Sequence, residues 1–139
     1  MQPCPCNPST LYKDCCFLFH SGEKIPKVPL EVMKSRYSAY AVQNAGYIMD
    51  TTHPKSPHFE KDKVNWALSI EKFGQETLFL KLEILEDTHY DKTGFVTFNA
   101  ILEKNGEDAS FQERSKFIYE NNLWFYFDGK PIMIKKKLK

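Results

Sequence analysis

Residues 77–86 read TLFLKLEILE, and this stretch decides the fold class of the chain. Apolar side chains occupy every second position in it, namely Leu78, Leu80, Leu82 and Ile84. A period of two is typical of a β-strand, because successive side chains of a strand point to opposite faces of a sheet. The sequence that follows predicts a hairpin turn at Asn105-Gly106 and three more strands, over residues 95–103, 109–119 and 122–128.

The sequence before this strand has a helical period instead. Apolar residues recur there at spacings of three and four and predict three helices, over residues 29–42, 45–51 and 61–73. Pro29 suits a first helical position, Asn44 suits a capping position, and Gly74 suits the end of the third helix. Helices followed by a meander of antiparallel strands indicate an α+β domain with the helices packed on one face of the sheet.

Composition limits the class of protein. The chain has 139 residues, the size of one domain, and its 42% apolar and 27% charged residues fit neither a disordered nor a membrane-spanning chain. A formal net charge of +1 argues against a broad nucleic-acid-binding surface. The basic tail at 135–139, KKKLK, could contact RNA or an acidic partner by counterion release, although such tails are more often solvated termini.

All four cysteines lie within the first sixteen residues: Cys4, Cys6, Cys15 and Cys16. No secretory signal sequence precedes them, so we expect a cytoplasmic location, where thiols stay reduced. Four clustered thiols then indicate a metal site, and zinc suits them because it binds four thiolates tetrahedrally at about 2.3 Å. A site closed by four thiolates leaves no position for water, so we expect this metal to be structural rather than catalytic.

The sequence leaves alternatives to this zinc site open. The thiols could be structurally idle or redox-active, four thiolates also suit iron, and His20 could replace one cysteine as a ligand. Around these residues we expect a helix over 10–19, capped by Ser9, which would carry the Cys15-Cys16 pair.

The cysteine spacing resembles a known motif. Cys-x-Cys, eight residues and Cys-Cys, with Tyr12-Lys13 just before the pair, look like the SEC-C zinc motif. The order of helices and strands resembles the ketosteroid-isomerase-like (nuclear transport factor 2-like, cystatin-like) cone, in which helices cover a curved antiparallel sheet and enclose a pocket. Short motifs sharpen this likeness: MKSRYSAY at 33–40, THP at 52–54, GFVTF at 94–98, ERSKF at 113–117 and WFYFDG at 124–129.

Together these features resemble the YchJ-like family, whose members join a SEC-C motif to this cone. The resemblance implies a SEC-C-like zinc-binding motif at residues 1–21 and a ketosteroid-isomerase-like α+β domain at residues 22–139. It implies a fold and a metal, but no assigned biochemical activity.

The alternation of side chains along a strand predicts which residues line a pocket in the expected cone, because residues two apart share one face of the strand. If the faces of the last two strands are concave, an aromatic-walled pocket is lined by His53, Trp66, Glu113, Ser115, Trp124 and Tyr126. In such a pocket His53 and Glu113 could act as acid and base. Equally, Glu113 can pair with Arg36 or Arg114, and a His before a proline often caps a helix end.

Two classes of function follow from these observations. We expect a zinc-binding protein that is not an enzyme and that binds a protein partner through the cysteine motif or a small ligand in the cone. The alternative is an isomerase- or dehydratase-like enzyme that uses His53 and Glu113. Phe125 and Phe127 face away from Tyr126, and covering them requires the tail or a second copy of the chain, which leaves room for a homodimer through the sheet.

Overall fold

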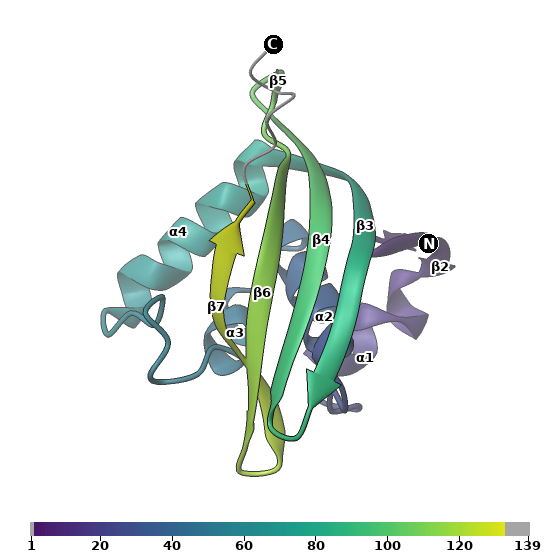
Figure 1. Ribbon diagram of the computed structural model, residues 1–139. Coiled ribbons are helices and arrows are strands. Elements are labelled where there is room, and N and C mark those ends of the chain that lie inside the picture. The colour runs from purple at the N-terminus through teal and green to yellow at the C-terminus, as the bar shows by residue number, and fades with distance from the viewer. Residues whose placement is uncertain (1, 133–139) are drawn as a thin grey trace.

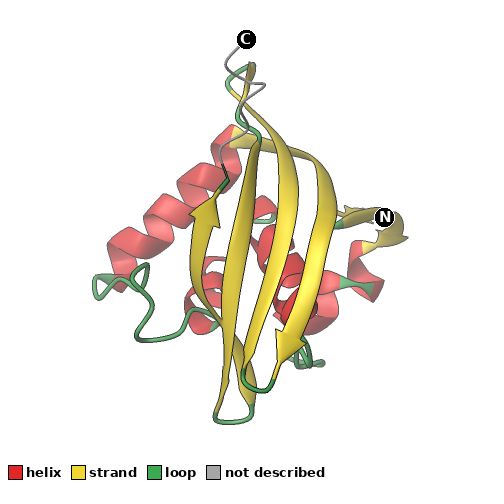
Figure 2. Cartoon of the chain, viewed as in Figure 1, coloured by secondary structure: helices red, strands yellow, loops and turns green. Residues whose placement is uncertain are grey.

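The computed structural model describes residues 2–132, so the basic tail at 135–139 lies outside the described residues. The helices are α1 (Cys16–His20), α2 (Pro29–Ala41), α3 (Ala45–Asp50) and α4 (Lys63–Glu76), with a 3₁₀ turn at Tyr12–Asp14. The strands are β1 (Pro3–Cys4), β2 (Asn7–Leu11), β3 (Thr77–Tyr90), β4 (Thr93–Lys104), β5 (Glu107–Asp108), β6 (Phe111–Glu120) and β7 (Leu123–Pro131). Figures 1 and 2 show their arrangement.

The main sheet has the antiparallel order β3-β4-β6-β7, and the short β5 pairs with β4. Helices α2, α3 and α4 lie on one face of this sheet, as Figure 1 shows. Strand β3 carries two bulges, between Phe79 and Lys81 and between Ile84 and Glu86, and bulges bend the strand that contains them. The α+β class, with helices packed on a curved antiparallel sheet, is therefore confirmed.

The predicted elements of this domain are present, with differences at their ends. The four predicted strands correspond to β3, β4, β6 and β7, and Asn105 and Gly106 have φ angles of 53° and 81°, as a tight hairpin turn requires. Asn44 caps α3, since its Oδ1 accepts a hydrogen bond of 3.1 Å from the Tyr47 N–H. The prediction for Gly74 is wrong, because α4 continues through it to Glu76.

Gly74 has a packing role in place of the predicted capping role. It is buried, and a Cβ at this position would overlap the backbone oxygen of Tyr40 in α2. The absence of a side chain therefore lets α2 and α4 approach closely, which brings the cavity-facing residues of the two helices together.

The N-terminal segment differs most from its prediction. A helix over 10–19 is wrong: β1 and β2 form a small antiparallel ribbon, with Pro3 opposite Leu11, before the 3₁₀ turn and the short α1. Ser9 caps no helix, and its hydroxyl donates to Asn7 Oδ1 at 2.7 Å. This ribbon folds the segment back on itself, so that the cysteines at its two ends meet.

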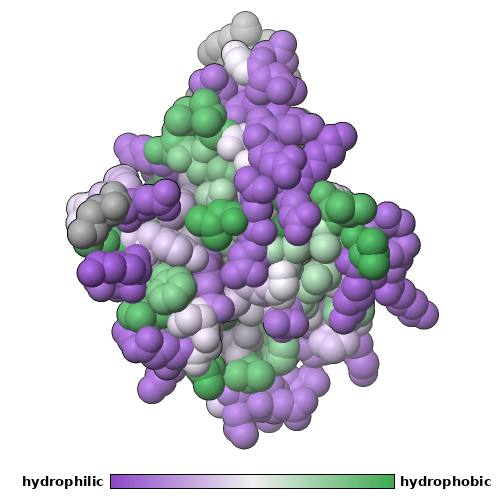
Figure 3. Space-filling view, turned by 180° about the vertical axis from the view of Figure 1, so that it is seen from behind, coloured by the Kyte–Doolittle hydropathy of each residue, from purple (hydrophilic) through white to green (hydrophobic). Residues whose placement is uncertain are grey.

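One core cluster joins the N-terminal segment to the main domain. Cys4, Cys6 and Cys16 are buried in the same cluster as apolar residues of α2 and of the sheet, such as Val32 and Phe117. From behind, apolar surface is visible as separate patches among polar groups (Figure 3). Within the described residues, no helix combines the length and apolar character needed to cross a lipid bilayer.

Candidate functional site

The four cysteines form a compact cluster between the β1–β2 ribbon and α2. All four sulfur atoms lie within 4.8 Å of one another, and none of them is in a disulfide. Cys6 Sγ is central, at 3.7 Å from Cys4 Sγ, 3.6 Å from Cys15 Sγ and 3.5 Å from Cys16 Sγ. The structure therefore brings together every cysteine that the sequence named as a ligand.

These separations fit one tetrahedral metal ion. Four sulfurs at about 2.3 Å from a common centre, at tetrahedral angles, would lie about 3.8 Å from one another. The three distances from Cys6 Sγ, 3.5–3.7 Å, are close to this value and far longer than a covalent S–S bond, and all other pairs lie within 4.8 Å. The donor set and its spacing are consistent with a metal site of four sulfur ligands.

The thiols are electrostatically coupled. Hydrogen bonds from Cys16 and Cys6 lower the pKa of the Cys4 thiol, and the hydrogen bond with Cys4 in turn raises the pKa of Cys16. Burial raises the pKa of Cys15 as well. Several thiolates at such short range would need a cation as their counter-charge, and a metal ion held by the four sulfurs would supply it.

His20 is held in a different role. Its Nε2 lies 2.8 Å from the backbone oxygen of Ser35, which requires this nitrogen to donate, and its Nδ1 then accepts from the Tyr12 hydroxyl at 2.7 Å. Both ring nitrogens are occupied by protein partners. His20 therefore ties the N-terminal segment to α2, and the alternative of a histidine ligand has no free nitrogen to support it.

The cluster rests directly on α2. Cys4 Sγ lies 3.5 Å from Ser38 Oγ, and Cys16 Sγ lies 3.7 Å from the backbone oxygen of Lys34. Other residues of the same helix, Arg36, Tyr37 and Tyr40, line a cavity under the sheet. Helix α2 therefore stands between the cysteine cluster and the cavity.

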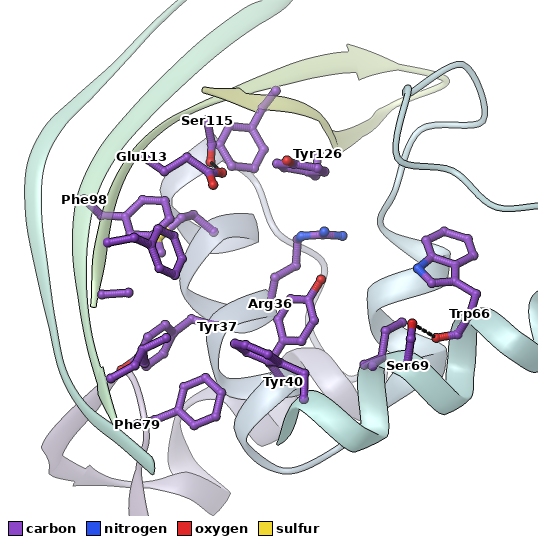
Figure 4. A pocket seen from close by; sticks show the side chains of 17 residues that line it. Arg36, Tyr37, Tyr40, Trp66, Ser69, Phe79, Phe98, Glu113, Ser115 and Tyr126 are labelled. Atoms are coloured by element: carbon purple, nitrogen blue, oxygen red, sulfur yellow. Dashed lines mark hydrogen bonds between the residues drawn. The ribbon is translucent and has the colours of Figure 1, made fainter. Parts of the chain in front are cut away.

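The cavity has a volume of about 450 Å³, within the range typical of small-molecule sites. Aromatic side chains form most of its wall, including Phe73, Phe79, Phe98, Phe111 and Phe117. Four of the residues that the sequence predicted as pocket lining are found there: Trp66, Glu113, Ser115 and Tyr126. Figure 4 shows that they come from α4, β6 and β7 and surround Arg36.

Arg36 is the buried charge of this cavity and was not among the predicted pocket residues. It is 8% exposed, and its Nη1 donates to Ile48 O, Thr51 Oγ1 and Thr52 Oγ1 at 2.9–3.0 Å. Its guanidinium carbon lies 4.3 Å from the centre of the Tyr126 ring. Burial lowers the pKa of this guanidinium, which remains a cation because its ordinary pKa is so high.

Glu113 supplies the opposite charge. Its Oε2 accepts a hydrogen bond of 2.8 Å from Ser115 Oγ, and the carboxyl group points from β6 into the cavity (Figure 4). Burial raises the pKa of Tyr126, and the neighbouring Glu113 charge raises it further, so this phenol stays protonated. Among the described residues no ion pair includes Arg36 or Glu113, so the predicted pairing of Glu113 with Arg36 or Arg114 is not formed.

A bulge in β7 sets which residues face the cavity. Phe117 is opposite Tyr126, but the preceding Lys116 is opposite Asp128, so Phe127 is the extra residue. The bulge moves Asp128 off the face of Tyr126 and places Gly129 there instead. A Cβ on Gly129 would overlap Glu113 Oε2, so the glycine makes room for the carboxylate.

His53 lies outside the cavity. Its Nε2 is 3.0 Å from Glu120 Oε1, its Nδ1 accepts from the Lys55 N–H, and its ring packs edge-on to Phe125 and Phe127 at 5.6 Å each. The segment before Pro54 joins β7 by backbone hydrogen bonds that flank Tyr126, so His53 sits on the face opposite to that of the Tyr126 ring. The predicted His53–Glu113 pair is therefore not assembled, and His53 itself covers the two phenylalanines.

Trp124 is also absent from the cavity wall. It is 7% exposed and packs against Tyr119 and His89, toward the hairpin ends of the sheet. The expected position on the face of Tyr126 is correct, but it lies too far along the strand to reach the cavity. Sequence reasoning missed Tyr40 and Arg36, although both stand in the quoted 33–40 motif, because a helical period marks a buried face without saying what it faces.

Comparison with known proteins assigns the chain to a protein family. Residues 28–129 match the family model described as the middle NTF2-like domain of YchJ. The chain is 36% identical over 128 residues to the UPF0225 protein VP1145 of Vibrio parahaemolyticus, an alignment that covers 91% of this chain and 73% of that protein. The chain belongs to the YchJ-like family.

Solved structures support the same assignment for this YchJ-like protein. A SEC-C motif containing protein from Rhodopseudomonas palustris superposes with a TM-score of 0.78 at 27% identity, covering 95% of this chain and all of that one. A SEC-C motif containing protein from Psychrobacter arcticus gives a TM-score of 0.76 at 26% identity, covering 96% and 85% of the two chains. The SEC-C motif and the cone-shaped domain thus occur together in proteins of the same architecture.

Proposed function

We propose that this chain is a zinc-stabilised protein that binds a small molecule in its cone. In this proposal the zinc ion is held by Cys4, Cys6, Cys15 and Cys16 and has a structural role, and the ligand occupies the cavity on the other side of α2. Zinc suits a closed site of four thiolates because it is redox-inert and prefers a tetrahedral geometry.

One observation carries the proposal: the same helix contacts the cysteine cluster on one side and the cavity on the other. Cys4 and Cys16 contact Ser38 and Lys34, while Arg36 enters the cavity from the intervening turn. Metal binding by residues near one end of the chain would therefore fix the position of the helix that supplies the cavity's buried charge.

The enzyme alternative is weakened by the positions of its two candidate residues. His53 is engaged with Glu120 and Lys55, and Glu113 is engaged with Ser115 inside the cavity. No acid–base pair between them is part of the proposal. A cavity with a fixed cation, a fixed carboxylate and aromatic walls is sufficient for binding and needs no catalytic group.

The test is the intact mass of the gently purified protein, measured under native and denaturing conditions. We expect a difference of one zinc ion, four free thiols after denaturation and, in protein from its own organism, the mass of a retained small molecule. A Cys15→Ser, Cys16→Ser double variant should lose the zinc. A Ser69→Phe variant, which narrows the cavity from α4, should keep the zinc and lose the small molecule.

Two results would contradict the proposal. Zinc retained by the double cysteine variant would overturn the metal assignment. A cavity that takes up no small molecule, whether retained from the cell or added afterwards, would overturn the ligand-binding part.

A further inference from the structure

The cavity contains two opposite charges that do not neutralise each other by direct contact. Arg36 and Glu113 both line it, yet no ion pair within 4.0 Å joins them among the described residues. Figure 4 shows the guanidinium between Tyr126 and Tyr40, and the carboxyl group on the sheet side. A buried charge is costly unless it is paired, so the buried Arg36 and the partly buried Glu113, which line one cavity without an ion pair, favour a molecule between them.

Each charged group has hydrogen-bonding capacity left. The hydrogen bonds of Arg36 to protein use Nη1, and a guanidinium has five N–H donors. Glu113 accepts one hydrogen bond from Ser115, whereas a carboxylate has about four acceptor positions. The cavity therefore offers a ligand donors on the Arg36 side and acceptors on the Glu113 side.

The charge of the cavity excludes two simple ligand classes. An anion attracted by Arg36 would be repelled by Glu113, and a cation attracted by Glu113 would be repelled by Arg36. A wholly apolar molecule would fill the aromatic space but leave the remaining donors of Arg36 and the remaining acceptors of Glu113 unused. A molecule without net charge that carries both a donor and an acceptor satisfies both groups at once.

We infer that the cavity binds an uncharged molecule with an aromatic or other apolar body and an amide-like polar end, whose N–H groups meet Glu113 and whose oxygen meets Arg36. This inference rests on the proposed ligand-binding function and names its ligand class. The body of the ligand lies against the phenylalanine wall, where Phe98 and Phe117 contribute apolar area. Gly129 keeps the carboxylate in place, because a side chain there would displace it.

The test uses four probes of one size that differ in charge and polarity: benzamide, benzoate, benzylammonium and toluene. Each is titrated into the zinc-loaded protein, and binding is followed by the NMR signal of the Trp66 indole N–H, since Trp66 lines the cavity. We expect benzamide to bind at least tenfold more tightly than the other three probes.

Three variants identify the groups responsible. Glu113→Gln leaves Arg36 as the uncompensated charge, so benzoate should gain at least tenfold relative to benzamide. Gly129→Ala keeps the charge but displaces the carboxylate, so benzamide should lose several-fold affinity while the order of the probes is unchanged. Glu86→Gln removes the same charge from the other face of the sheet, where Glu86 pairs with Arg114, and should change neither result.

The outcomes separate this inference from the proposed function. Equal binding of all four probes, or a preference for benzoate in the unmodified protein, would overturn the inference and leave a ligand-binding cavity in place. A change in preference of the same size in Glu86→Gln would also overturn it, because the effect would then be general electrostatics. No binding of any probe, together with no retained molecule in the native mass, would remove the proposed function as well.

Discussion

The two sides of helix α2 differ in how they are built. On one side, four cysteines within thirteen consecutive positions meet in a cluster whose sulfurs are all within 4.8 Å. On the other side, the cavity combines residues of α2, of α4 and of all four long strands of the main sheet, and Arg36 and Tyr126 are 90 positions apart. The first site depends on a local motif, whereas the second depends on sheet register and helix packing. The two sites should therefore respond differently to substitution.

The largest effect is expected on the cysteine side. The Cys15→Ser, Cys16→Ser double variant removes two ligands and leaves the other thiols buried without a metal, so the free energy of unfolding should fall by at least about 4 kcal/mol. Urea denaturation followed by circular dichroism measures this loss. As a control, the unmodified protein in excess chelator should lose a similar amount. A double variant as stable as the parent would show that the cluster does not support α2.

A smaller loss is expected on the cavity side. Arg36→Met keeps much of the side-chain volume but removes the donors to Ile48, Thr51 and Thr52, which should cost about 3 kcal/mol. Zinc content should stay at one ion per chain, which would distinguish a loss of stability on the cavity side from damage to the cysteine cluster. Arg36→Lys, which keeps the charge, should recover part of the loss. Loss of zinc in Arg36→Met would contradict this expectation and show that the cysteine cluster needs Arg36 to hold the metal.

The sequence predicted the first site more completely than the second for a physical reason. Candidate cysteine ligands are recognisable by residue type and spacing, even though the helix expected around them is in fact a ribbon, a 3₁₀ turn and the short α1. Cavity residues are recognised by parity, which holds only until a bulge shifts it. The bulge at Phe127 moved Asp128 away and brought in Gly129, and the alternation of side chains in WFYFDG does not reveal it.

The same contrast explains why some of the predicted pocket residues line the cavity and others do not. Glu113, Ser115 and Tyr126 lie on the same face of the neighbouring strands β6 and β7, so parity was enough to place them. His53 lies in a segment without regular structure, which attaches to β7 by backbone hydrogen bonds that side-chain patterns do not reveal. The order of helices and strands, and therefore the fold class, followed from periodicity alone.

Two glycines, Gly74 and Gly46, test whether the close packing of α2 against α4 contributes to stability. Gly74→Ala should lower the free energy of unfolding by about 2 kcal/mol, because its Cβ would overlap the backbone oxygen of Tyr40 and force α2 and α4 apart. Gly46 is the matched control: it also lies in a helix, but it is exposed and its Cβ would make only an ordinary contact. Gly46→Ala should therefore stabilise the protein by about 0.5–1 kcal/mol. Equal effects at the two positions would show that the helices do not need the close approach.

The smallest effect on stability is expected at the ion pair between Glu86 and Arg114. On the face of the sheet away from the helices, hydrogen bonds from Arg114 and Thr97 lower the pKa of Glu86 to about 2. A carboxyl group whose pKa is lowered on folding adds stability above its unfolded pKa of 4.5, and this contribution is lost as the pH falls toward 2. Because both side chains are partly exposed, Glu86→Gln should lower Tm at pH 7 by less than about 3 °C.

The difference in Tm between Glu86→Gln and the parent should be constant from pH 7 to pH 5 and shrink below pH 4.5, as thermal unfolding at each pH would show. If the difference in Tm grew as the pH fell, the prediction that folding stabilises the ionised form of Glu86 would be wrong. The comparison with Arg36 is then direct: the partly exposed pair in contact contributes little to stability, while the buried Arg36 is held by neutral groups and forms no ion pair with Glu113. This unpaired charge, rather than its contribution to stability, is the reason to look for a ligand between Arg36 and Glu113.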